Sequence, residues 1–215
     1  MSYAERMARL TARKIAQTAD KQAKLGARDE DDYGLVLPPE TFKADLPVRD
    51  ATGQFSGPRA WAANFRWLME RHPLYIDPDD AIAGRWMFML SRMRLGYQLS
   101  RSNFAFDYSF LEPLQKKYDI TTGIGKDAHF APDYRIGLEL GWDGLLAKVR
   151  AARQKFAADP VAAELLEAEA AAILGVQTWI RRLGEAAADR SMTEADAERR
   201  ANLVAMARTC FAIVD

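Results

Sequence analysis

The sequence predicts a mainly helical fold. Apolar residues recur at three- and four-residue spacing over long segments, for instance from Val161 to Leu183, and this period places them on one face of an α-helix. Aspartate-proline pairs precede several such segments, as is typical of helix starts. The alternation of β-branched residues that marks half-buried strands is scarce. With 215 residues, 49% of them hydrophobic, the chain can bury a core.

Residues 1–57 are predicted to form a leading helix and an irregular arm. In residues 4–25, Met7, Leu10 and Ile15 recur with approximately helical periodicity, and basic residues lie between them. Residues 26–57 combine an acidic run at 29–32 with several prolines and glycines, which favours irregular extended structure. The acidic run lacks the regular oxygen spacing of a calcium loop, so no metal site is expected there.

Two helices are expected between residues 58 and 95. The first begins at Pro58, carries Trp61 and Leu68 on its core face, and ends before Pro73. For the second, Asp77 has the position of an N-cap and Pro78 that of the first helical residue, and the helix is expected to reach about residue 95. The arginines of this second helix are interpreted as the rim of a packed helix rather than as a nucleic-acid surface.

Residues 110–156 are expected to hold a short helix at 110–118, a glycine-rich loop at 123–132, and a long helix from Pro132 to about Phe156. The loop lacks the glycine spacing of a phosphate loop, and an aspartate follows its lysine, so nucleotide binding is not expected. Three glycines in the long helix should bend it or let another backbone approach: Gly137, Gly141 and Gly144.

The last two helices are predicted from their starts and apolar stripes. Asp159-Pro160 begins a helix with one stripe from Val161 to Leu183, and Thr193 with Asp196 resembles a capping box before the final helix. The stripe of the final helix consists of Leu203, Ala207, Cys210 and Val214. Cys210 is therefore interpreted as a small buried hydrophobe rather than a nucleophile.

Composition excludes several classes of protein. Thirty basic residues balance thirty acidic ones, so no overall field attracts nucleic acid or an anionic membrane. One cysteine cannot form an internal disulfide, and two histidines leave little for a zinc site, so a reducing cytoplasm is expected and no metal ligands are assigned. No apolar run approaches the roughly 20 residues of a membrane span.

Three segments, in order, resemble the glycyl radical enzymes of the pyruvate formate-lyase-like family. The first is the loop and helix from Gly123 to Leu146, with His129, then Pro132-Asp133-Tyr134, then a glycine-punctuated helix. The second runs from His72 to Gly84, and the third from Arg200 to Val214. The resemblance covers residues 58–215 and is to the N-terminal portion of such enzymes, so these residues are predicted to form one helical domain.

The resemblance implies a longer parent enzyme. Family members fold as a ten-stranded barrel wrapped in helices, with a catalytic cysteine on a mid-barrel loop and a glycyl radical on a C-terminal loop. A radical S-adenosylmethionine activase installs the radical. This sequence has neither an Arg-Val-x-Gly-Tyr-like radical motif nor a cysteine at the catalytic position. We therefore expect a fragment that is inactive by itself, with no catalytic residue and no cofactor of its own.

The implied partners are the remainder of the barrel, a second copy in a homodimer, and the activase, in an anaerobic cytoplasmic lyase or dehydratase. In diol-dehydrating members a histidine of the loop motif holds substrate hydroxyls, and His129 matches that position. A structural loop histidine is the alternative for His129. The alternative for the whole chain is a stand-alone helical scaffold that binds a partner protein.

Overall fold

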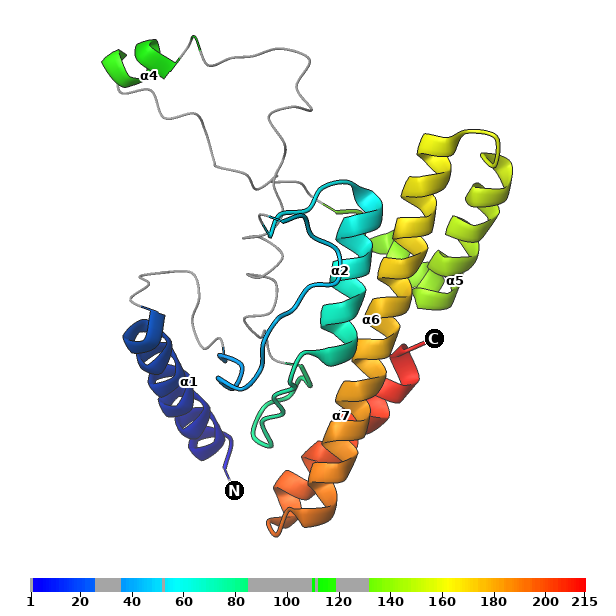
Figure 1. Ribbon diagram of the computed structural model, residues 1–215. Helices are drawn as coiled ribbons and strands as arrows, with labels where there is room; N and C mark the ends of the chain where they lie inside the picture. Colours follow the sequence, from blue (N-terminus) through cyan, green and yellow to red (C-terminus); the bar gives the residue numbers. More distant parts are fainter. Residues whose placement is uncertain (1, 26–35, 52, 85–109, 111, 119–131) are drawn as a thin grey trace.

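The computed structural model describes residues 2–25, 36–51, 53–84, 110, 112–118 and 132–215 (Figure 1). Over these ranges helices are the regular structure and no extended strand occurs, which confirms the mainly helical prediction. Their bounds are α1 (Tyr3–Leu25), α2 (Pro58–Arg71), α4 (Glu112–Tyr118), α5 (Tyr134–Lys155), α6 (Pro160–Thr193) and α7 (Ala197–Ile213). No helix in the described ranges has the length and apolar character needed to cross a membrane.

Helix α6 is the central element, and α2, α5 and α7 each pack against it. Figure 1 shows α6 running the length of this bundle, with α5 beside its N-terminal half and α7 beside its C-terminal half. The α6/α7 core centres on Leu183, Ala187, Leu203 and Met206, all of which are buried. The predicted stripe of the last helix is confirmed, because its four members are all buried.

The N-terminal end of α6 departs from its predicted stripe. Val161 is 77% exposed and Leu165 is 48% exposed, so these two members of the predicted stripe are not buried within the described part of the chain. At the other end of the predicted stripe, Leu183 is 3% exposed. The helix itself was predicted correctly, but only the later part of its stripe is covered by described elements.

Aspartates cap the starts of α5, α6 and α7, and one predicted cap has to be corrected. Asp133 and Asp159 cap α5 and α6 through their side-chain oxygens, as predicted. Before α7, however, the cap is Asp196, whose carboxylate accepts from the backbone amides of Glu198 and Arg199. Thr193 is the last residue of α6, and its hydroxyl donates to the carbonyl of Arg190. The capping box at Thr193 was wrong because Asp196, three residues later, is itself the N-cap of α7.

Gly141 bends α5, which confirms one of the predicted glycine roles. Its backbone has φ 62° and ψ −175°, a conformation outside the helical region. A Cβ placed on it would lie 3.2 Å from the carbonyl oxygen of Asp215, so the residues that follow α7 approach α5 closely at this point. The kink separates an exposed first half of α5 from a second half that packs against α6.

The arm is irregular as predicted over its described residues, 36–51 and 53–57. It is held to α2 by Asn64, which is fully buried, accepts from the amide of Val48 at 2.9 Å and donates to its carbonyl at 2.7 Å. Leu46 and Phe55 of the arm join Leu68 and Met69 of α2 in a second buried cluster.

The predicted helix at residues 77–95 is wrong where it can be checked. Residues 77–84 form turns and bends rather than a helix, and residues 85–95 lie outside the described ranges. The carboxylate of Asp77 accepts from the amide of Asp79, as in a turn, and both carboxylates face arginines from distant elements. These ion pairs, and not a helix dipole, satisfy the two acids.

Candidate functional site

The one predicted substrate-binding residue, His129, lies outside the described residues, as do residues 119–131 of the glycine-rich segment. Its role therefore stays a prediction. Among the described residues, a group of charged side chains lies together that was not predicted from the sequence. It consists of Arg9, Arg13, Asp77, Asp79 and Arg199, and is called the arginine–aspartate cluster below.

Asp79 is the centre of the arginine–aspartate cluster. Its buried carboxylate accepts from Arg9 of α1 at 2.7 and 3.2 Å and from Arg199 of α7 at 3.1 and 3.2 Å, so each guanidinium is bidentate. Arg13 bridges the two acids, with one nitrogen on Asp77 and the other 3.1 Å from Asp79. The cluster thus connects α1, the segment after α2, and α7.

The segment that carries the two aspartates is fixed from the other side by α6 and α7. Asn202 of α7 donates to the carbonyls of Pro78 and Asp80 at 2.8 and 2.7 Å. Arg190 of α6 donates to the carbonyl of Ile76. Side-chain donors therefore satisfy backbone carbonyls of this irregular, largely buried segment, which has no regular secondary structure to pair them.

The electrostatics of the cluster favour the ionised form of Asp79. The hydrogen bonds from Arg9, followed by those from Arg199 and Arg13, hold the pKa of Asp79 well below its ordinary value, although burial opposes this shift. The three arginines also outnumber the two acids. The lowered pKa of Asp79 suits a carboxylate that works as a structural clamp rather than as a proton donor or acceptor.

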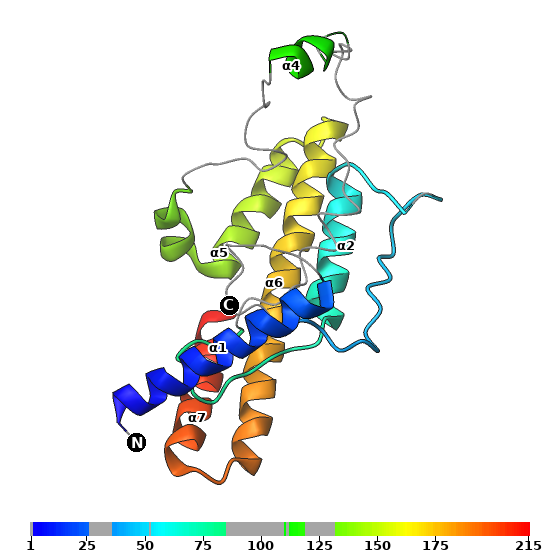
Figure 2. The same cartoon turned by 90° about the vertical axis from the view of Figure 1, so that its left-hand side faces the viewer.

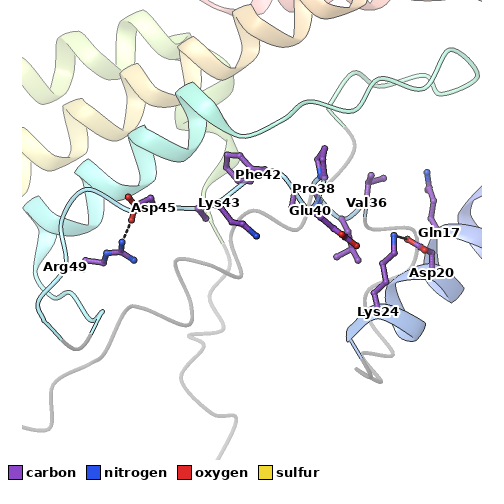
Figure 3. Close-up of a pocket in the computed structure, with 13 residues that line it drawn as sticks. Gln17, Asp20, Lys24, Val36, Pro38, Glu40, Phe42, Lys43, Asp45 and Arg49 are labelled. Atoms are coloured by element: carbon purple, nitrogen blue, oxygen red, sulfur yellow. Dashed lines mark hydrogen bonds and ion pairs between the residues drawn. The ribbon is translucent and has the colours of Figure 1, made fainter.

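An open pocket of about 980 Å³ lies between the C-terminal half of α1 and the arm (Figure 3). Gln17, Asp20 and Lys24 of α1 line one side, and arm residues including Glu40 and Phe42 line the other. Its charged groups include local ion pairs, Lys24 with Asp20 at 3.0 Å and Arg49 with Asp45. This mixed lining gives the pocket no strong preference for one sign of charge.

His72 and Cys210, the described histidine and cysteine, are both part of the packing. His72 is 1% exposed, its Nδ1 lies 2.8 Å from the carbonyl oxygen of Pro73, and its ring meets Phe42 edge-on at 4.9 Å. Burial lowers the pKa of His72, so the ring is neutral near pH 7.

Cys210 lies in the α6/α7 interface, where its Cβ is 3.0 Å from the position that a Cβ on Gly184 would take. Burial raises the pKa of the thiol. The interpretation of Cys210 as a buried hydrophobe is confirmed by its 5% exposure. No group of three potential metal ligands occurs among the residues that the structure describes.

The sequence did contain one signal for the cluster. Arg6, Arg9 and Arg13 recur at three- and four-residue spacing, so they share one face of α1. Buried acids elsewhere in the chain are the natural counterpart of such a face. Their positions, however, are 64 to 73 residues away, beyond the reach of a local pattern.

Comparison with known proteins supports the family resemblance. Residues 117–215 match the family described as pyruvate formate lyase-like. The structure is similar to that of the glycerol-bound form of the B12-independent glycerol dehydratase from Clostridium butyricum, with a TM-score of 0.51 and 15% sequence identity. The similarity covers 73% of this chain and 26% of the dehydratase chain. No curated protein sequence gives a significant match.

These two findings confirm the resemblance to pyruvate formate-lyase-like enzymes that the sequence motifs indicate. The family match falls on the segment with the glycine-rich loop, α5, α6 and α7. At 15% identity, the structural similarity is evidence for a shared helical arrangement and not for a shared substrate.

Proposed function

We propose that this chain is the N-terminal helical part of a pyruvate formate-lyase-type glycyl radical enzyme, and that residues 58–215 form one domain of it. The observation that carries the proposal is the family match at residues 117–215, supported by a fold shared with a dehydratase. The chain spans only 26% of the length of that dehydratase. The proposed role is therefore to supply part of the helical layer around a barrel that the remainder of the parent protein forms.

The chain by itself is proposed to be non-catalytic. A glycyl radical enzyme needs a thiol beside a protected radical loop, and the one cysteine of this chain is packed between α6 and α7. The described residues therefore do not fit a radical site. The parent is proposed to receive its organic radical from a radical S-adenosylmethionine activase and to work as a homodimer.

For the parent reaction, we propose a radical lyase or dehydratase activity with His129 in the substrate pocket. Support comes from the match of His129 to the motif of diol-dehydrating members and from the name of the structural neighbour, a glycerol dehydratase. An imidazole could bind or protonate a substrate hydroxyl near pH 7.

The role of His129 is tested by His129→Ala in the protein encoded by the complete reading frame, with folding, radical yield and turnover measured. Lost turnover with normal folding and radical yield supports the pocket role. Unchanged turnover, or a failure to fold, would make His129 structural.

The family assignment is tested by anaerobic activation. The protein of the complete reading frame and the present chain are each incubated with an activase and S-adenosylmethionine, and electron paramagnetic resonance spectra are recorded. The proposal expects a glycyl doublet from the complete protein and none from the chain. Absence of the doublet from the complete protein would refute the family assignment, and a doublet from the chain, lost on glycine substitution, would refute the proposal that the chain is non-catalytic.

A stand-alone scaffold that binds a partner protein is the second candidate, and one observation favours it. The first half of α5 exposes large apolar side chains, including Tyr134 at 74% and Leu138 at 85%, which a partner would cover. The length of the reading frame discriminates between the two. Several hundred further codons with a cysteine loop and a radical-glycine motif would eliminate the scaffold.

A further inference from the structure

Helix α1 is joined to the rest of the protein by polar contacts. It is not among the helix pairs that pack closely, which are α2 with α6, α6 with α7, and α5 with α6. Leu10 is its one buried hydrophobic residue, whereas Tyr3 and Ile15 are 79% and 65% exposed. Figure 1 shows α1 set apart from the bundle, near the segment that follows α2, and in the view of Figure 2 the helix crosses in front of the bundle.

A row of arginines makes most of the described hydrogen bonds between α1 and the rest of the protein, and Lys21 further along the helix is also buried, with 1% of its surface exposed. Arg6 donates to the carbonyl of Asp79 at 2.6 Å, Arg9 is bidentate on the Asp79 carboxylate, and Arg13 bridges Asp77 and Asp79. The side chains of Arg9 and Arg13 are 35% and 31% exposed, whereas those of the two aspartates are fully buried. The basic face of α1 therefore contacts two buried carboxylates, and the segment of residues 76–80 that carries them is called the acidic platform below.

The acidic platform is also held by side chains of α6 and α7. Arg199 of α7 also pairs with Asp79, and Asn202 fixes the backbone at Pro78 and Asp80. Arg190 of α6 fixes the backbone at Ile76. If α1 leaves, these bonds from α6 and α7 remain, and Arg199 still neutralises one negative charge.

Docking of α1 also forms one wall of the pocket described above. Gln17, one turn beyond Arg13, donates to the hydroxyl of Tyr75 at 2.9 Å, and that hydroxyl lies 3.4 Å from the Asp77 carboxylate. Gln17, Asp20 and Lys24 then line the pocket. The position of the wall is thus connected to the arginine–aspartate cluster through Tyr75.

We propose that α1 is a releasable strap, latched by Arg9 and Arg13 onto Asp77 and Asp79, whose undocking removes one wall of the pocket while the α2/α5/α6/α7 bundle stays folded. This inference does not rest on the proposed enzyme family. Charge-assisted hydrogen bonds are the stronger kind, so a latch of this type can hold a helix that buries little apolar surface. Loss of the latch should leave α1 as an isolated helix, which is only marginally stable in water.

The strap is tested by hydrogen–deuterium exchange, read by mass spectrometry on the full chain. The test variant is Arg9→Gln/Arg13→Gln, and the matched control is Lys14→Gln/Lys24→Gln, which removes the same charge from the same helix outside the cluster. In the test variant, peptides of α1 should exchange at least about tenfold faster, while those of α6 and α7 keep wild-type rates. The control should leave α1 protected.

Two results would overturn the strap. Wild-type protection of α1 in the test variant would show that the cluster does not hold the helix. Equal loss of protection in α1, α6 and α7 would show that α1 is an integral part of one cooperative unit. Because Arg9 and Arg13 are partly exposed and lie outside the helical core, their replacement should not itself prevent folding. Asp79→Asn serves as the second variant and should release α1 as well.

Discussion

Two glycines of α5, four residues apart, should respond to alanine in opposite directions. Gly141 has φ 62° and ψ −175°, in a region essentially restricted to glycine, and a Cβ there would approach the Asp215 carbonyl oxygen to 3.2 Å. Gly137 lies in the helix, is exposed, and would have no atom within 4 Å of an added Cβ. The same chemical change therefore meets strain at one site and open space at the other.

The magnitudes follow from the two backbone conformations. Forcing alanine into the conformation of Gly141 should cost about 1–3 kcal/mol. At Gly137, alanine should instead stabilise the helix by about 0.5–1 kcal/mol, because glycine loses more conformational entropy on folding. For a protein of this size, about 1 kcal/mol corresponds to roughly 2–4 °C in the midpoint of thermal unfolding.

The assay is thermal and urea unfolding of the two variants, followed by circular dichroism. We expect Gly141→Ala to unfold roughly 2–12 °C below the wild type and Gly137→Ala a few degrees above it. A neutral or stabilising Gly141→Ala would refute the reasoning, because it would mean that α5 runs straight through residue 141. An equal loss for both variants would point to an effect of the substitution that the local backbone does not explain.

Two further predictions concern the core and the cluster. Leu203→Ala, at a fully buried position between α6 and α7, should lower the free energy of unfolding by about 2–5 kcal/mol. Leu138→Ala, at an 85% exposed position, should change it by less than about 0.5 kcal/mol. Equal effects of the two variants in urea unfolding would contradict the described packing. The second concerns Asp79, whose pKa is lowered in the folded state by Arg9, Arg199 and Arg13. Because the unfolded chain then binds more protons, the stability due to Asp79 is complete above its unfolded pKa of about 4 and is lost as the pH falls below that value. As the pH is lowered, the free energy of unfolding of Asp79→Asn should therefore fall less steeply than that of the wild type. Identical slopes of unfolding free energy against pH would argue against the ion pairs.

Local sequence rules predicted the long helices well. The starts at Pro58, Asp133 and Asp159 were predicted from proline and capping chemistry, and the buried stripe of α7 from its period. These features depend on residues within a few positions of each other. A single sequence contains all the information that such local rules require.

The same rules failed where distant residues decide the structure. Asp77 and Asp79 had the order of a helix start, but arginines from α1 and α7 pair with the acids, and an irregular segment results. The apolar residues Val161 and Leu165 had the period of a buried face, but no described element covers them. Neither outcome can be read from neighbouring residues, because each depends on what another part of the protein places there.

We propose that this chain is the helical outer part of a larger radical enzyme, and an experimental structure of the protein encoded by the complete reading frame would test this proposal. In that structure, α2, α5, α6 and α7 should keep the arrangement seen here and pack against a ten-stranded barrel, with Tyr134 and Leu138 buried in the contact. A structure in which these helices stand apart from any barrel, with both side chains still exposed to solvent, would contradict it.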